Sequence, residues 1–189
     1  MSGAVLPVRT VTRWFLEMTA PDQLAPAPPP DRELEVRCAE LPSPELSRFL
    51  YTAVGGDWYW LDRLGWDWSR WHAYLARPGV ETWIGWVRGT PAGYAELVAR
   101  DGIVEIAYFG LLRGFIGHGL GPRLLHAAVA RAWGLGASRV RLSTCTLDAP
   151  AARRTYERAG FTVYDVREER VTLPEQPPGP WPGARRPPA

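Results

Sequence analysis

Residues 103–125, IVEIAYFGLLRGFIGHGLGPRLL, are the most informative part of the sequence, because an apolar run there leads into a glycine-rich loop. The run predicts a strand at 103–112. The loop, GHGLG at 117–121, is followed at once by Pro122, and proline is favoured at the first position of a helix. We therefore expect a helix from 122 to about 133.

The glycines of this loop indicate a site for an anion. They let the backbone approach a ligand closely and expose successive N–H groups, and the positive end of the helix dipole adds to these amides. Such a site suits a pyrophosphate, with Arg113, His118 and Arg123 as charges at its rim. The GxGxG spacing differs from the GxGxxG of dinucleotide-binding folds. The alternative that the glycines only form a tight turn stays open.

Turn signals before and after residues 103–125 predict the other elements. Asp101-Gly102 is a strong hairpin signal, and turn residues at 89–93 separate two earlier runs, so three strands form an antiparallel meander. Ser69 is expected to cap a helix. The further elements expected are strands at 34–39, 82–88, 94–100 and 140–146, helices at 44–54 and 69–76, a helix capped by Asp148 and ended by Gly160, and a pair of strands within 161–173.

Proline-rich stretches divide the chain. Alternation at 12–18 predicts one more strand, either an added edge strand or a dimer contact. The segment 25–30, APAPPP, predicts a stiff linker, and the seven prolines of the last sixteen residues predict a disordered tail. We expect an N-terminal strand and linker at 1–30, one domain at 31–173 and the tail at 174–189.

Composition excludes several classes of function. All 22 basic residues are arginine, so a phosphate-binding loop that needs lysine and a Schiff-base lysine are both excluded. A net charge of +2 with scattered arginines argues against a nucleic-acid partner. The two cysteines and three histidines show no metal-ligand spacing, so no metal is expected. No apolar run approaches 18 residues, and we expect a cytoplasmic protein without a membrane partner.

Two motifs resemble those of the GCN5-related N-acetyltransferase (GNAT) family. Residues 116–121 are similar to its acyl-CoA loop, Arg/Gln-x-x-Gly-x-Gly/Ala, and Ala152, Tyr156 and Gly160-Phe161 are similar to its Ala-x-x-x-Tyr-x-x-x-Gly-Phe pattern. The likeness covers roughly 34–172. It implies an α/β (α+β) GNAT fold with a mixed, mostly antiparallel sheet of six to seven strands and about four helices.

Two positions depart from the family pattern. Ile116 stands where the family has Arg or Gln, and Ala149 stands where an asparagine often precedes the final helix. Asp148, beside it, either replaces the asparagine or is merely an N-cap.

The resemblance implies that acetyl-CoA is the co-substrate. Its pantetheine arm would pair with 109–112, where a backbone N–H near Leu111 would face the thioester oxygen as an oxyanion hole. The residues that the resemblance assigns to the cofactor are Leu111, Leu112, Arg113, Ile116, Gly117, His118, Gly119, Leu120, Gly121, Arg123 and Asp148.

Two residues are candidates for proton transfer, as the resemblance implies. Glu105, a carboxylate within an apolar strand, resembles the general-base position of histone-acetylating members, although it could instead lie on a solvated face or pair with an arginine. Tyr156 resembles the general acid that protonates the CoA thiolate, and the alternative is a tyrosine of the core. Cys145 carries no sign of activation, so we expect a buried strand cysteine.

Five tryptophans fall within 57–71, DWYWLDRLGWDWSRW, which the resemblance puts on the acceptor side. Together with Asp57, Asp62 and Asp67 they suit an aromatic or cationic acceptor. The alternative is that at least half of the indoles pack helices onto the sheet. The candidates for acceptor binding are Trp58, Trp60 and Trp66.

The function that these observations favour is transfer of acetyl from acetyl-CoA to an amine, on a small molecule or a peptide, by direct attack. The alternative is a catalytically inactive acyl-CoA-binding module acting through a partner, which the departures at Ile116 and Ala149 support. A third hypothesis is a structural protein with an accidental glycine turn. A homodimer is compatible with the fold.

Overall fold

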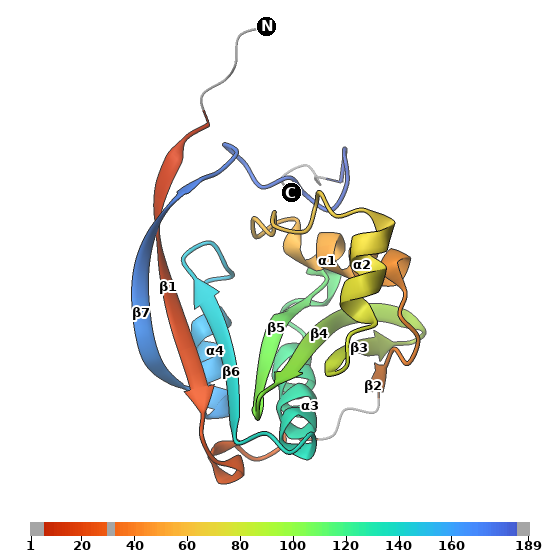
Figure 1. The fold of residues 1–189 in the computed structure, drawn as a ribbon, viewed down its shortest axis with the longest axis vertical. Coiled ribbons are helices and arrows are strands. Elements are labelled where there is room, and N and C mark those ends of the chain that lie inside the picture. The colour runs from red at the N-terminus through yellow and green to blue at the C-terminus, as the bar shows by residue number, and fades with distance from the viewer. Residues whose placement is uncertain (1–5, 30–32, 185–189) are drawn as a thin grey trace, which may run out of the picture.

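The computed structural model describes residues 6–29 and 33–184. Over these residues the chain forms seven strands, four α-helices and two short 3₁₀ turns (Figure 1). The elements are β1 (Val8–Met18), η1 (Pro21–Gln23), β2 (Leu34–Cys38), α1 (Pro44–Gly55), α2 (Trp68–Leu75), β3 (Val80–Val87), β4 (Thr90–Arg100), β5 (Ile103–Leu111), η2 (Arg113–Phe115), α3 (Leu120–Gly134), β6 (Arg139–Cys145), α4 (Ala152–Ala159) and β7 (Thr162–Thr172).

The strands form one sheet in the order β2-β3-β4-β5-β6-β1-β7. Neighbouring strands are antiparallel except β5 and β6, which are parallel. The predicted mixed, mostly antiparallel sheet with about four helices is confirmed, and so is the meander of β3, β4 and β5.

Helices cover the two faces of the sheet unequally. The main apolar core lies between the sheet and α3 and α4, and it includes Leu125 and Val129 of α3. On the opposite face α1 and α2 pack over β3, β4 and β5, with Leu50 and Trp71 buried beneath them. Figure 1 shows α1 and α2 on one side of the sheet and α3 and α4 on the other.

The N-terminal strand lies inside the sheet and is not the edge strand that alternation allowed. β1 pairs antiparallel with both β6 and β7. Leu16 and Met18 are completely buried against the main core, so burial of apolar side chains holds β1 at an interior position. A single long strand, β7, takes the place of the pair expected within 161–173.

Helix starts differ from the predictions at three places. Helix α3 begins at Leu120 and not at Pro122, so this proline is its third residue. The cap of α2 is Asp67, which accepts a hydrogen bond from the Arg70 N–H at 2.8 Å, and not Ser69. Residue Ala151 occupies the N-cap position of α4, and no side-chain cap bond is present there. The predicted cap Asp148 therefore has another role, described below.

Part of the predicted tail is held against the domain. The carbonyl of Glu175 accepts hydrogen bonds from Arg9 at 2.8 Å and from the Tyr59 hydroxyl at 3.2 Å. The Gly179 N–H donates to the Gly56 carbonyl at 2.9 Å. Residues 185–189 of the tail, 1–5 of the N-terminal segment, and residue 30 of the linker lie outside the described residues.

Candidate functional site

The parallel strands β5 and β6 diverge at the centre of the sheet. They are paired only where 103–105 lie beside 139–141, and toward their C-terminal ends a gap opens between them (Figure 1). A cavity of about 590 Å³ occupies this region. Its lining comes from the second half of β5, the glycine loop, the end of β6 with the loop that follows, the start of α4, and the connection between α1 and α2.

The edge of β5 offers backbone groups to this cavity. The Leu112 N–H donates to the Ala92 carbonyl at 2.9 Å, on the β4 side. Because amides point alternately to the two sides of a strand, the Leu111 N–H points toward the gap. Leu111 lines the cavity, so its amide is available to a ligand placed between the strands.

The glycine loop borders the same cavity at the start of α3. Gly117 and Gly119 have φ values of 90° and 74°, which favour glycine. A Cβ at either position would meet no atom of the described chain within 4 Å, so packing does not explain these glycines. No side chain caps α3 at Gly119, so the first amides of this helix receive no side-chain acceptor.

The cavity includes only part of the predicted cofactor set. The predicted residues that line it are Leu111, Ile116, Gly117, Gly119, Gly121 and Asp148. Leu112 and Leu120 instead pack into the protein interior, and Leu120 is only 5% exposed. Arg113 is exposed and forms an ion pair with Asp57 at 3.5 Å. His118 and Arg123 lie beside the lining residues but are not among them.

Tyr156 of α4, for which the resemblance implies a general-acid role, lies at the wall of the cavity. It is 8% exposed and packs edge to face against Phe109 of β5 and Phe161, with ring centroids 6.0 and 6.4 Å apart. Burial, with the charge of Asp148 as a smaller cause, raises the pKa of Tyr156 well above its ordinary value. The phenol is therefore a proton donor throughout the neutral and mildly alkaline range.

Asp148 turns back to the end of β6, which corrects its predicted role as the cap of α4. One carboxylate oxygen accepts hydrogen bonds from the Thr144 hydroxyl at 2.7 Å and from the Cys145 N–H at 2.9 Å. Burial, followed by this carboxylate, raises the pKa of the Cys145 thiol. Cys145 lines the cavity but stays protonated near neutral pH, so it is not an activated nucleophile.

Glu105 lies away from the cavity that the other site residues share. It falls in the part of β5 still paired with β6, where its neighbours across the strands are Val98 and Arg141. Its side chain is exposed and does not line the cavity. The geometry thus matches the solvated face that the sequence left open and does not favour the general-base role.

The tryptophan-rich connection contributes both to the cavity and to the core. Trp58 and Trp60 line the cavity. Trp66, predicted with them, instead packs against Trp71 and Tyr74, with ring centroids 5.1 and 5.3 Å away, so it stabilises the placement of α2. The packing of Trp66 fits the alternative that at least half of the indoles pack helices onto the sheet.

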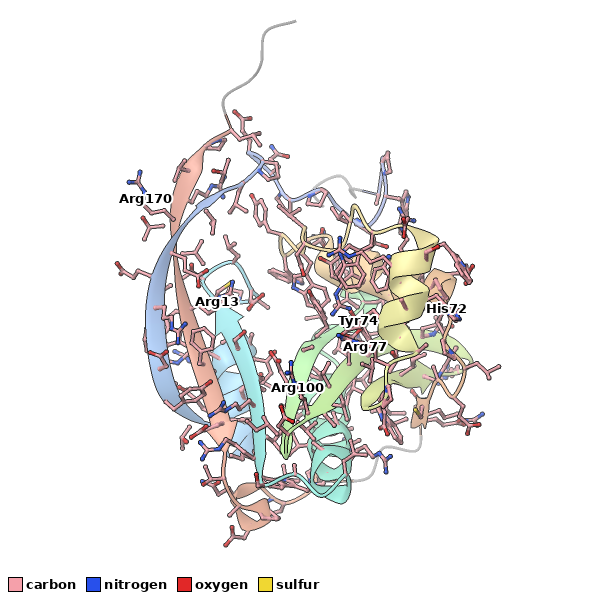
Figure 2. All side chains as sticks on the ribbon, in the orientation of Figure 1. Arg13, His72, Tyr74, Arg77, Arg100 and Arg170 are labelled. Carbon is pink, nitrogen blue, oxygen red and sulfur yellow. The ribbon has the colours of Figure 1, made fainter. Side chains whose placement is uncertain are left out.

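Three lining residues, Arg13 of β1, Tyr59 and Tyr108 of β5, were not assigned by sequence reasoning. Asp62 also lines the cavity and was one of the carboxylates expected on the acceptor side. Arg13 had no signal, because it reaches the site only through the interior position of β1. Figure 2 labels Arg13 on β1, beside the end of β6.

The carboxylate of Asp62 is held by two tyrosines. It accepts hydrogen bonds from the Tyr51 hydroxyl at 2.7 Å and from the Tyr108 hydroxyl at 2.5 Å. The Arg63 N–H in turn donates to the Tyr51 oxygen at 3.2 Å. Burial raises the pKa of both phenols well above their ordinary value, so both remain donors to this carboxylate.

A buried ion pair fixes the same connection to β4. Both terminal nitrogens of Arg63 donate to Glu96 at 2.9 Å, and the two residues are 6% and 1% exposed. The Tyr74 hydroxyl donates to Glu96 at 2.5 Å from α2, where Figure 2 shows it on the inner side of the helix and His72 on the outer side. Burial alone would lower the pKa of Arg63, but the hydrogen bonds and charge of Glu96 raise it.

Among the described residues there is no group of three or more His, Cys, Asp and Glu placed to hold a metal. None of the helices within them is long and apolar enough to cross a membrane.

Comparison with known proteins identifies similar chains. The family model described as Acetyltransferase (GNAT) family matches residues 40–161. No curated protein sequence matches the chain. Among solved structures, a GCN5-related N-acetyltransferase from Sphaerobacter thermophilus is 19% identical with a TM-score of 0.65 over 91% of this chain and 56% of that one. Another from Kribbella flavida is 23% identical with a TM-score of 0.61, over 84% of this chain and 57% of that one.

The chain thus spans little more than half of these two structures. A third, an aminoglycoside acetyltransferase from an uncultured soil metagenomic sample, solved with trehalose, is 11% identical with a TM-score of 0.57, over 68% of this chain and 88% of that one. At these identities the likeness shows the fold.

Proposed function

Because the chain belongs to the GNAT acetyltransferase family, we propose that it transfers the acetyl group of acetyl-CoA to the nitrogen of an amine acceptor. The observation that carries this proposal is that one cavity is lined both by the glycine loop and by the aromatic connection between α1 and α2, with the unpaired edge of β5 between them. Two substrates can therefore meet at the gap between β5 and β6.

The glycine side suits the CoA portion of the donor. The uncapped amides at the start of α3 offer donors for its pyrophosphate, and the open space at Gly117 and Gly119 leaves room for close approach. The pantetheine arm would extend the sheet along the free edge of β5. These features support acetyl-CoA binding without the polar residue that Ile116 replaces.

The reaction follows from the groups around the gap. The neutral amine nitrogen forms a bond to the thioester carbonyl carbon, and the Leu111 N–H is available to stabilise the oxyanion. The carbon–sulfur bond then breaks, and Tyr156 gives its proton to the departing CoA thiolate. The Tyr156 phenolate takes back the proton that the acylated nitrogen loses, so the phenol is restored. Since the acceptor ammonium first loses one proton to water to become the neutral amine, the sum is acetamide, CoA thiol and one released proton.

A second candidate, an acyl-CoA-binding module without catalysis, is favoured by the exposed position of Glu105 outside the cavity. Both candidates require binding of acetyl-CoA, and only the enzyme requires release of CoA thiol when an amine is present.

The test is calorimetric titration with acetyl-CoA and with NAD, followed by thiol release on a panel of amines. We expect saturable binding of acetyl-CoA, no binding of NAD, and thiol release with at least one amine. Binding without thiol release on any amine would replace the enzyme by the module. Absence of acetyl-CoA binding would overturn both candidates.

A further inference from the structure

We propose that the acceptor is a small amine with a single positive charge and an apolar body, whose ammonium group is held by Asp62 among the aromatic side chains of the α1–α2 connection. This inference rests on the proposed function, because it names the class of acceptor. Of the three carboxylates in the tryptophan-rich segment, it selects Asp62 as the one that binds the ammonium group.

Asp62 has acceptor capacity left for a ligand. Its carboxylate offers about four lone-pair positions, and two are used by Tyr51 and Tyr108. Asp62 is itself exposed and borders the cavity. An ammonium group, with three N–H donors, can therefore add charge-assisted hydrogen bonds without displacing either tyrosine.

Aromatic side chains surround this carboxylate. Trp58, Tyr59, Trp60 and Tyr108 all line the cavity, and Trp60 packs edge to face against Tyr108 with ring centroids 4.8 Å apart. The faces of indole and phenol rings attract cations, and they also pack against apolar groups. An ammonium group attached to an apolar body matches both properties of the wall.

The site is fixed before any ligand arrives. Arg63, the residue next to Asp62, is tied to Glu96 by two hydrogen bonds beneath the connection. The guanidinium carbon of Arg63 also lies 4.1 and 4.3 Å from the ring centroids of Tyr74 and Tyr108. A connection held in this way loses little conformational entropy on binding, which favours affinity for a small ligand.

The charges around the cavity select a single positive charge. Of the described residues that line it, Asp62 and Asp148 are the carboxylates, and Asp148 is turned to Thr144 and Cys145 across the gap. Arg13 adds a positive charge on the β1 side, partly offset by Glu169 at 3.6 Å. A polycation would be repelled by this arginine and would find only one carboxylate, that of Asp62, to pair with its several charges. A monoamine needs only Asp62 as its partner.

The experiment compares three ligands by calorimetry on the full chain: phenethylamine, its neutral analogue 2-phenylethanol, and the polycation spermidine. We expect phenethylamine to bind at least tenfold more tightly than either of the others. In Asp62→Asn the affinity for phenethylamine should fall at least tenfold and match that of 2-phenylethanol. Asp101→Asn, the same charge change at the distant β4–β5 turn, should leave the preference unchanged, since asparagine tolerates the positive φ of 51° there.

Equal affinity for phenethylamine and 2-phenylethanol would overturn the proposal, as would an Asp62→Asn variant that keeps the preference. Tighter binding of spermidine than of phenethylamine would overturn the inference that the acceptor carries a single positive charge. If Asp62→Asn does not fold, Tyr108→Phe, which removes one donor to Asp62, should still weaken phenethylamine binding at least threefold, and unchanged binding would count against the site.

The proposed function fails separately. Loss of acetyl-CoA binding would overturn it while the ammonium preference persists. Normal acetyl-CoA binding without an ammonium preference would overturn this inference alone.

Discussion

Replacing Glu96 by glutamine should destabilise the protein by about 3 kcal/mol, because the change removes the charge that compensates a buried guanidinium. Arg63 is 6% exposed and Glu96 1%, so water cannot take over the lost interaction. Breaking a buried pair by removing one partner typically costs about 3–5 kcal/mol. We take the lower end, because glutamine keeps one oxygen that can accept from Arg63 or Tyr74.

The assay is thermal unfolding followed by circular dichroism. For a chain of this size each kcal/mol lowers Tm by about 2–4 °C, which gives an expected fall of about 6–12 °C. The matched control is Glu35→Gln. Glu35 forms an ion pair with Arg37 at 2.6 Å, but the side chains are 60% and 72% exposed, and an exposed pair of this kind contributes less than about 1 kcal/mol.

A second substitution separates charge from packing. Adding Arg63→Met to Glu96→Gln removes the uncompensated cation. The double variant should regain at least half of the fall in Tm, because replacing a buried ion pair by apolar side chains is often neutral or stabilising. A stabilising role of the Arg63–Glu96 pair is refuted if Glu96→Gln melts within about 2 °C of the wild type, if the control falls equally, or if the double variant is less stable than Glu96→Gln.

Four further predictions concern the cavity. Gly119→Ala adds a Cβ at a φ of 74°, so about 1 kcal/mol of strain and at least a tenfold loss of acetyl-CoA affinity by calorimetry are expected; unchanged affinity would remove the loop from the site. Tyr156→Phe should lower turnover by about 10²–10⁴-fold with acetyl-CoA affinity unchanged, and an unaltered rate would exclude the hydroxyl. The pKa of Tyr156 is raised, so its hydroxyl stays protonated until the pH passes that value. The wild type should therefore lose no turnover through deprotonation of Tyr156 below about pH 10. A fall in turnover near pH 8 that disappears in Tyr156→Phe would contradict this. Cys145→Ala should keep turnover within threefold, and a hundredfold loss would indicate a covalent intermediate.

Local signals in the sequence predicted the parts of the fold that depend on neighbouring residues. Asp101-Gly102 marked the β4–β5 hairpin, and the glycine loop before Pro122 marked the start of α3. The place of β1 could not be obtained in this way, because its partners in β6 and β7 lie more than 100 positions away. The hydrogen-bond partners of Asp148 could not be predicted either. Its carboxylate can accept from the amides at a helix start or, as observed, from Thr144 and Cys145 at the end of β6.

The site was harder to predict because of one irregularity in the sheet. The register of β4 and β5 shifts between Glu96 and Leu97, so that β5 contains an extra residue. Ile106 therefore packs toward α3 while Tyr108 packs toward α1, although strict alternation would put both on one face. No sequence pattern marks this bulge, and without it the pairing of Tyr108 with Asp62 cannot be foreseen.

The interior position of β1 also determines when the protein can fold during synthesis. Glu17 and Arg139, which form an ion pair between β1 and β6, lie 122 positions apart. At about 5–20 residues per second, a ribosome needs roughly 6–24 s to reach the second after making the first. Throughout that time the apolar side chains of β1 have no strand to pair with, and the sheet closes only when β7 follows. A chain truncated before β6 would therefore keep the apolar side chains of β1 exposed. Such exposed apolar surface promotes aggregation, and chaperones bind it, so we expect truncated products of this protein to depend on chaperones for solubility.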